Sequence, residues 1–474
     1  MKLITHISEM VKRNSVGGPQ AIGLFGIWTL FVWVSQIAVF DVHLPSFVSK
    51  KILHAAMGVS LFSIAIALFL IARKAEIKPR VFESVDRVFA ILASVSAGCI
   101  FAPGYLAVDY YDDALAIAGT ILCGATIAWL YARWASLLAE MNGKLAVISL
   151  FGGCLIWPIA TFILGLLPKL AAQCALMVIP CVSCLLLHYL SRYLQDGHRH
   201  VGHRKEVTVS AWKAWLTIVS VCLVLSFPIE MTKGPVLEEF RIVPSLIKGI
   251  MPFACYAGVL WWMLGPNNKT DFPSLWRFVF YALGLSLTLM ALFPSFSWVT
   301  VFLSSVWMML VPIVWITVCE IARHSLRNRM VNVSLGLALY CAASALGGFL
   351  YSEVFQSTPS YVLCVLLLFL LFIVLGFCLG TRDPGTQCLF EDLRGERSIE
   401  EFDTINSRCE EMGAIYGLTS REVEILKMIC KGRSRAYMAE TLFITENTVK
   451  THVSHIYGKL GVHSKTELQH FIGV

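Results

Sequence analysis

The chain has 474 residues and a formal net charge of +7 at pH 7, and 57% of its residues are hydrophobic against 15% that are charged. Ordinary soluble domains carry about 25% charged residues, so the composition excludes a soluble globular protein as a description of the whole chain. A mean hydropathy of +0.71 indicates a membrane protein.

The apolar residues come in blocks of about 20, the length of helix that crosses a hydrocarbon core about 30 Å thick. The blocks end by residue 380, so we expect an all-α fold in which residues 1–380 form a polytopic membrane domain. Twelve spans are predicted, at residues 20–40, 52–72, 88–108, 114–132, 145–167, 170–191, 213–231, 245–265, 275–293, 297–319, 331–352 and 360–380.

The loop charges predict the orientation of these spans. The first block is longer than the core of a signal peptide and lacks a small-residue cleavage site, so we expect it to be a span. With a cytoplasmic N-terminus, the inside loops carry 21 Lys and Arg residues and the outside loops carry six, as the positive-inside rule requires. An even number of spans then places both termini in the cytoplasm.

Six blocks, a basic loop at residues 192–212 and six more blocks give a 6+6 layout. This layout resembles the major facilitator superfamily, whose two halves enclose a central cavity. The resemblance covers residues 1–380. The family's Gly-Asp-Arg-rich signature is absent from the loop Arg73–Arg80 and from the corresponding loop Gly265–Asp271, which argues against transport.

Ionisable side chains are scarce in the middle of the predicted spans, where they usually mark ion or proton pathways. Those within the apolar blocks lie near span ends, where solvent or snorkelling satisfies their charge. Glu320 precedes Arg323 by one helical turn, which predicts a structural ion pair at a cytoplasmic end. The residues near span ends are His54, His188, Glu230, Lys248, Arg277 and Glu320.

Tryptophan is spread through both halves of the membrane domain. Interfacial anchoring and packing account for such a distribution, and a cavity that accepts a neutral or aromatic small molecule is the alternative. The residues concerned are Trp28, Trp33, Trp157, Trp261, Trp262, Trp298, Trp307 and Trp315.

The sequence gives no indication of catalysis, a cofactor or a metal site. Most of the fifteen cysteines lie in apolar blocks, where free cysteine behaves as a small hydrophobe. Cys181 and Cys184 have the spacing of a redox pair, but they lie within a span and no second ligand pair flanks them. We therefore expect no enzyme activity.

Residues 381–416 are expected to be a cytoplasmic linker with one amphipathic helix. Arg382-Asp-Pro-Gly385 ends the last span with residues that break helices, and Ser398 with Glu401 forms a capping box. The apolar face of this helix must cover the C-terminal module, a second copy of itself or the membrane domain. Its residues recur every three or four positions, at Ile399, Phe402, Ile405, Cys409 and Met412.

Residues 417–474 predict a compact module of four short helices. Thr419 and Glu422 form a capping box that opens the first helix, and the second is expected over residues 434–442. Thr445 caps the third helix and Gly461 ends it, while Ser464 with Glu467 caps the fourth. The expected core face of the third helix is Val449, Val453, Ile456 and Leu460.

The segments Leu418–Glu422, Ile444–His452 and Ile456–Ser464 resemble the C-terminal helix-turn-helix of LuxR-type transcription regulators. The resemblance implies that the third helix lies in the major groove of double-stranded promoter DNA and that the module dimerises through its fourth helix. It also implies that Arg421 and Glu422 form a structural ion pair that ties helices together.

The same resemblance assigns the residues that contact DNA. It implies that one set of side chains reads the bases. A second set contacts the DNA backbone and its phosphates, in part at the N-terminus of the fourth helix. The base-reading set is Lys450, Thr451 and Ser454, and the backbone set is Thr448 and Lys459. Ser464 and Lys465 lie where the fourth helix opens, so we expect them to hold phosphates as well.

The leading hypothesis is a transcription regulator embedded in the bacterial plasma membrane, with a membrane domain at 1–380, a linker at 381–416 and a DNA-binding domain at 417–474. Its expected partners are promoter DNA, the lipid bilayer, a small-molecule ligand and a second copy of the chain. A transporter that also signals to DNA is the alternative, and a tethered factor released by proteolysis is a third possibility.

Overall fold

The computed structural model describes residues 23–38, 50–74, 79–102, 112–141, 143–195, 212–231, 242–264, 272–293, 297–325, 328–379, 389–390, 408–430, 438–439, 442, 444–462 and 467–468. Within these residues the regular secondary structure is helical, which confirms the all-α prediction. The chain divides into two compact units, Met1–Leu393 and Arg394–Val474.

We call the first unit the membrane unit. Each predicted span overlaps one of its helices. Among the described residues, eight helices are long and apolar enough to cross a membrane, so the count of twelve spans remains a prediction. The helices are α2 (Trp28–Ala38), α3 (Lys50–Lys74), α4 (Pro79–Phe101), α5 (Asp112–Leu138), α6 (Gly143–Leu166), α7 (Lys169–Gln195), α8 (Trp212–Met231), α9 (Ile242–Leu264), α10 (Phe272–Leu292), α11 (Ser297–Arg323), α12 (Arg329–Leu350, continued by the π-helix η4, Tyr351–Phe355) and α13 (Ser360–Val374, continued by η5, Leu375–Leu379).

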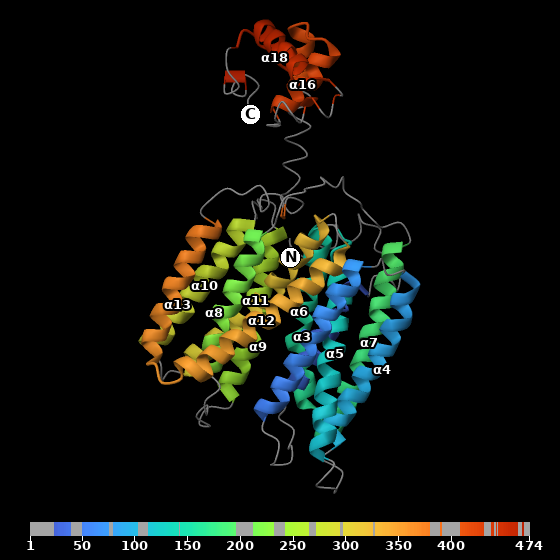
Figure 1. Cartoon of the computed structure of the whole chain (residues 1–474), viewed down its shortest axis with the longest axis vertical. Coiled ribbons are helices and arrows are strands. Elements are labelled where there is room, and N and C mark those ends of the chain that lie inside the picture. Colours follow the sequence, from blue (N-terminus) through green and yellow to red (C-terminus); the bar gives the residue numbers. More distant parts are fainter. Residues whose placement is uncertain are drawn as a thin grey trace. The chain divides into compact units, whose positions relative to one another are not determined.

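The membrane unit has two halves, α2–α7 and α8–α13, that repeat the same packing. Helix α2 contacts α6 and α7, and α4 contacts α5 and α7; in the second half α8 contacts α12 and α13, and α10 contacts α11 and α13. Two contacts between the halves, α3 with α12 and α6 with α9, are related by the same repeat. Helices α4 and α7 lie at one flank and α10 and α13 at the other (Figure 1).

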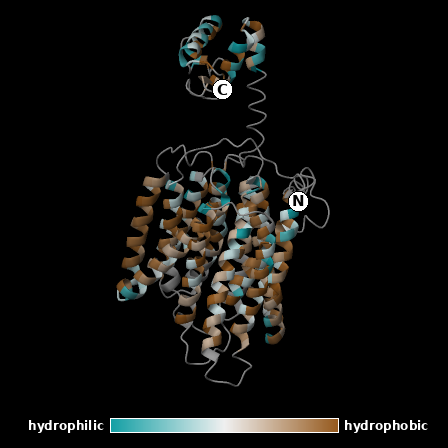
Figure 2. Ribbon diagram, turned by 45° about the vertical axis from the view of Figure 1, so that its right-hand side comes forward, coloured by the Kyte–Doolittle hydropathy of each residue, from teal (hydrophilic) through white to brown (hydrophobic). Residues whose placement is uncertain are grey.

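The outer faces of the membrane unit carry large apolar side chains. Phe372 is 72% exposed, Leu166 70% and Val59 67%, and Figure 2 shows hydrophobic residues along most of the length of these helices. Exposure of so much apolar surface to water would be unfavourable in free energy. The surface is therefore suited to the hydrocarbon core of a lipid bilayer.

Small residues allow the helices of the membrane unit to approach closely. A side chain on Gly124 of α5 would collide with the backbone oxygen of Met57 in α3, and one on Gly347 of α12 would collide with Ser226 in α8. Membrane helices gain little from the hydrophobic effect against one another, so close backbone packing of this kind stabilises them.

The second unit, which we call the DNA-binding unit, is organised around α16 (Ser420–Cys430) and α18 (Glu446–Leu460). The predicted core face of α18 is confirmed, because Val449, Val453, Ile456 and Leu460 are all buried. They pack with Ile425, Leu426 and Ile429 of α16 in one hydrophobic cluster.

The predicted ends of α18 are also confirmed. The Thr445 side chain accepts a hydrogen bond from the backbone N–H of Thr448, and Gly461 ends the helix in the left-handed region with φ 68°, a conformation that glycine adopts at little cost. The predictions for Ser398, Glu401, Ile399, Phe402, Ile405 and Ser464 lie outside the described residues.

The helical residues 408–415 show what covers this end of the linker helix. Cys409 is fully buried in the core of the DNA-binding unit, with its Sγ 3.9 Å from Sγ of Cys430. Glu410 accepts a bond of 2.5 Å from Lys427 of α16. Of the three surfaces left open by the sequence, the DNA-binding module is therefore the one that this part of the linker packs on.

A glycine sets the distance between this linker helix and α16. A Cβ added at Gly413 would lie 2.5 Å from Cγ2 of Val423, whereas one added at Gly458 of α18 would meet nothing within 4 Å. We expect Gly413→Ala to destabilise the DNA-binding unit by about 1–3 kcal/mol through overpacking. The matched change Gly458→Ala should stabilise it by about 0.5–1 kcal/mol through helix propensity.

Urea unfolding of residues 394–474 measures both effects. Equal midpoints for the two variants would contradict the close packing of the linker helix on α16.

Candidate functional site

One face of α18 is polar and exposed. Lys450, Thr451 and Ser454 are exposed on the side opposite the buried core residues, and Asn447 and His455 lie with them. The Thr451 hydroxyl donates to the backbone oxygen of Asn447 at 3.0 Å, which leaves the outward lone pairs of its oxygen available to a donor. This face presents one cation among short polar side chains.

The predicted backbone-contacting residues have different surroundings. Thr448 lies at the N-terminus of α18, where its backbone N–H and its hydroxyl both bond Thr445. Lys459 donates to Glu422 Oε2 at 2.7 Å and to the backbone oxygen of Gly417 at 3.0 Å, so its ammonium already has two acceptors within the unit. Ser464 and Lys465 lie outside the described residues.

Glu422 is the shared partner of these contacts and joins α16 to α18. Its side chain is 4% exposed. The Thr419 backbone N–H donates to Glu422 Oε2 at 2.8 Å, and the Glu422 backbone N–H donates to Thr419 Oγ1 at 3.3 Å, which confirms the predicted capping box. The bonds from Lys459 and from the Thr419 backbone lower the pKa of Glu422 from 4.5 to about 2.

The expected ion pair between Arg421 and Glu422 is not formed. Arg421 pairs with Glu424 at 2.8 Å and donates to the backbone oxygen of Leu442 at 2.6 Å. Both residues therefore tie elements together, as the resemblance implied, but each does so through its own partner. The two side chains are adjacent in sequence and leave α16 in different directions, which prevents a bond between them.

The lowered pKa of Glu422 predicts a pH dependence of the unit's stability. A depressed carboxyl pKa favours folding above the ordinary value of 4.5, and this contribution is lost as the pH falls towards about 2. We expect Glu422→Gln to cost about 1–2 kcal/mol at pH 7, with screening by nearby solvent allowed for. The cost should fall to about half of this or less at pH 3, which lies between the two pKa values.

The matched change Glu424→Gln removes a carboxylate that is 53% exposed, and it should cost less than about 1 kcal/mol at either pH. Urea midpoints of residues 394–474 at the two pH values measure these differences. Equal losses for Glu422→Gln at pH 7 and pH 3 would contradict the assignment.

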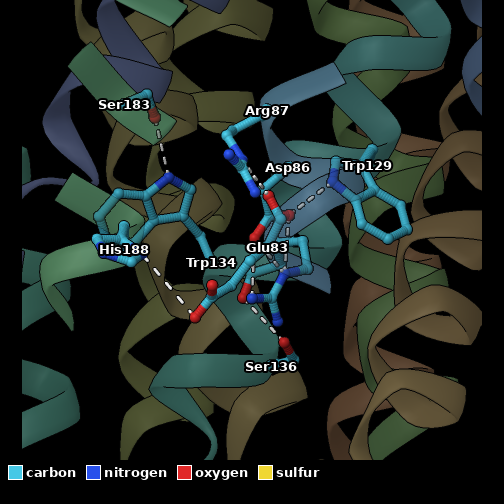
Figure 3. Close-up of polar contacts among 9 residues, drawn as sticks. Glu83, Asp86, Arg87, Trp129, Trp134, Ser136, Ser183 and His188 are labelled. Atoms are coloured by element: carbon cyan, nitrogen blue, oxygen red, sulfur yellow. Dashed lines mark hydrogen bonds and ion pairs between the residues drawn. The ribbon is translucent and has the colours of Figure 1, made fainter. Parts of the chain in front are cut away.

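In the membrane unit, an ion pair is buried between α4 and α5 (Figure 3). Arg133 Nε lies 2.9 Å from Asp86 Oδ1, and each residue is 5% exposed. The indole of Trp129 donates to the same carboxylate at 2.8 Å, and the Arg133 guanidinium lies 4.3 Å from the centre of the Phe82 ring. Arg133 is one of the 21 cations that were counted in the inside loops from the sequence, and this assignment is wrong, because Arg133 is buried within α5.

Polar contacts extend this cluster to α7 without crossing to the second half. Trp134 Nε1 donates to Ser183 at 3.0 Å, and His188 Nδ1 lies 4.0 Å from Glu83 (Figure 3). Because Asp86 and Arg133 neutralise each other inside one half, their geometry favours a structural role over a proton relay.

A second buried charge cluster does join the halves. The predicted pair of Glu320 with Arg323 is confirmed, but Glu320 is fully buried, so neither solvent nor snorkelling satisfies it. Arg323 also donates to the backbone oxygen of Leu138 in α5 at 3.4 Å. Close by in sequence, Arg329 at the start of α12 pairs with Glu140 at 3.2 Å.

Five aromatic rings form a continuous chain through both halves, which we call the aromatic chain. Trp315 of α11 stacks on Tyr131 of α5 with centroids 4.8 Å apart. Phe31 of α2 lies 6.1 Å from Tyr131 and 5.5 Å from Trp157 of α6. Trp157 in turn lies 6.5 Å from Tyr256 of α9. Rings of this kind bind neutral or aromatic molecules through stacking.

Two of the eight tryptophans singled out from the sequence belong to the aromatic chain, Trp157 and Trp315. Trp261 is 63% exposed on the outer surface, and Trp33 is buried elsewhere. The side chains of Trp298 and Trp307 lie outside the described residues. Within the described residues, no three His, Cys, Asp or Glu side chains are grouped to hold a metal ion.

Comparison with known proteins separates the two units. Residues 417–472 match the family of bacterial regulatory proteins of the LuxR type. The chain is 39% identical over 71 residues to the response regulatory protein YgeK of Escherichia coli, covering 14% of this chain and 48% of that protein. It is 44% identical over 62 residues to the transcriptional regulatory protein YhcZ of Bacillus subtilis, covering 13% and 29%. The chain thus spans less than half of these relatives' own length.

The membrane unit is similar in fold to transporters. A bacterial homologue of the iron transporter ferroportin, in its outward-facing state, aligns with a TM-score of 0.55 and 13% identity over 77% of this chain and 100% of that chain. The proton:xylose symporter XylE of the major facilitator superfamily aligns with a TM-score of 0.48 and 12% identity, over 79% and 98%. Residues 417–472 are a LuxR-family DNA-binding domain, and one chain joins them to a membrane unit similar in fold to a bacterial homologue of the iron transporter ferroportin.

Proposed function

We propose that the protein is a one-component transcription regulator of the bacterial plasma membrane, which senses a small molecule through its membrane unit and binds promoter DNA through α18. The observation that carries the proposal is the exposed polar face of α18 in a LuxR-family domain that is covalently joined to a membrane unit. The inside-loop charges support a cytoplasmic position for the DNA-binding unit.

The charge of the DNA-binding unit supports binding as a homodimer. Residues 417–474 hold eight basic and five acidic side chains, and the basic Lys427 and Lys459 are already paired with Glu410 and Glu422. The net charge of these residues, eight basic less five acidic, is only +3, so we expect the electrostatic attraction of one copy to DNA to be weak. Two copies on adjacent half-sites would restore the affinity.

Lys450 is the residue whose removal tests the DNA contact. Lys450→Ala should weaken binding by about 1–3 kcal/mol, or about 5- to 150-fold, if Lys450 bonds a base edge. Lys427→Ala removes the same charge from α16 and serves as the matched control. We expect it to change affinity by less than about threefold.

Fluorescence anisotropy of residues 394–474 on DNA selected from a random library measures both affinities. Equal binding by wild type and Lys450→Ala would exclude α18 as the helix in the groove.

The aromatic chain supports a neutral or aromatic small molecule as the signal. It joins α2, α5 and α6 of one half to α9 and α11 of the other, so a molecule that inserts among the rings would change how the halves pack. The buried charges of the described residues are paired and hold the fold, which favours a sensor over a proton-coupled carrier.

A panel of neutral aromatic compounds tests the sensing role. Transcripts of cells with and without the gene identify an active compound. Trp157→Leu should then raise the concentration for half-maximal response by at least about tenfold, because it removes two ring contacts. Trp261→Leu, at an exposed position, should leave the response unchanged.

A transporter that also signals is the second candidate, and the fold likeness to a transporter favours it. Uptake of the active compound, in labelled form, into proteoliposomes that contain the full chain distinguishes the two. Saturable uptake that Trp157→Leu abolishes would establish transport in place of sensing alone.

A further inference from the structure

The chain returns to the membrane unit after its last helix. Leu389 and Phe390 lie ten and eleven residues beyond the end of η5 at Leu379, and they are 2% and 0% exposed. Both pack in the hydrophobic core of the membrane unit. The Phe390 backbone N–H lies 3.4 Å from Glu320 Oε2 and donates to it. We call these two residues the output plug, because they lie on the path to the DNA-binding unit.

The backbone of Phe390 shows that this position is specifically held. Its φ is 66°, and it is the one residue other than glycine with a positive φ in the described part of the chain. A bulky aromatic residue adopts the left-handed region only when its surroundings impose it. The burial of the ring and the bond to Glu320 are the contacts that impose it here.

The carboxylate that holds the output plug belongs to α11 and is linked to the other half of the membrane unit through Arg323. Glu320 bonds Arg323, and Arg323 donates to the backbone of Leu138 in α5. One turn from Arg323, the Cys319 thiol lies 3.5 Å from the Ala135 backbone oxygen of α5. Separation of α5 from α11 would remove the Leu138 acceptor from Arg323 and open the surroundings of Glu320 to water.

We propose that the output plug docks only while the ends of α5 and α11 are together, and that their separation releases it. The proposal rests on the proposed function, since it supplies the step between a change in the membrane unit and the DNA-binding unit. A change in the packing of the halves is thereby converted into release of the chain segment that leads to the DNA-binding unit. Release of the output plug by this route requires neither movement of a ligand across the membrane nor a transport cycle.

The full-length protein in lipid nanodiscs tests this without DNA or a ligand. Hydrogen–deuterium exchange reports the peptide that contains Leu389 and Phe390. Cys319 is fully buried between the halves, so its labelling by N-ethylmaleimide, located by mass spectrometry, reports separation of α5 and α11.

Two variants force the separation. Arg329→Glu, at the start of α12 and six residues after the end of α11, places a like charge against Glu140 beside the end of α5. Ala135→Trp inserts a bulky ring between α5 and Cys319 of α11. We expect both to increase Cys319 labelling and to accelerate exchange at the output plug by at least about tenfold. The exchanged pair Glu140→Arg with Arg329→Glu should return both to wild-type values. Increased Cys319 labelling with unchanged exchange at the plug, or an unchanged plug in both variants, would overturn the proposal.

The coupling is also measurable in reverse, because linkage between two equilibria is reciprocal. Phe390→Ala should weaken docking and increase Cys319 labelling. The control Phe372→Ala removes the same ring from a position that is 72% exposed on α13, and it should not. Equal Cys319 labelling in wild type and Phe390→Ala would show that the plug is a passive contact.

Discussion

A carboxylate that is removed from water must be paired, because an isolated buried charge costs several kcal/mol. The three buried carboxylates of the described chain are therefore where its parts are held together. Asp86 joins α4 to α5, and Glu422 joins α16 to α18. Glu320 joins α11 to the chain that follows the last helix and, through Arg323, to α5. Each takes partners from elements that are separate in sequence, so each fixes a tertiary contact.

The sequence predicted well those features that depend on local periodicity. A block of about 20 apolar residues can satisfy its backbone in a bilayer only as a helix, and each predicted block overlaps a helix. In the DNA-binding unit, the spacing of Val449, Val453, Ile456 and Leu460 identified the core face, and Thr445 and Gly461 identified the ends of α18. Caps and helical faces involve neighbours within one or two turns, so a single sequence contains them.

The features that the sequence missed depend on partners far away in the chain. Asp86 and Arg133 are 47 residues apart, and each alone resembles an ordinary charge at a span end. Their signal was present but weak: Trp129 and Arg133 are four residues apart on α5, so both reach one carboxylate on α4. The contact of Phe390 with Glu320 crosses 70 residues. No local pattern distinguishes Phe390 from any other apolar residue after a Pro-Gly break.

The net free energy of docking of the output plug is small enough to be reversed by a ligand. Burial of the Phe390 ring contributes about 2–3 kcal/mol, and a hydrogen bond to a charged group contributes about 1.5–3 kcal/mol. The left-handed backbone opposes docking by about 1–2 kcal/mol. The difference of a few kcal/mol keeps the plug docked while the ends of α5 and α11 are together. A coupling free energy of about 1–3 kcal/mol between two sites, which is the typical size, is therefore large enough to shift this equilibrium. A relaxed backbone at residue 390 would strengthen docking and leave a ligand less able to reverse it. The strained φ of Phe390 therefore fits a contact that forms and breaks reversibly.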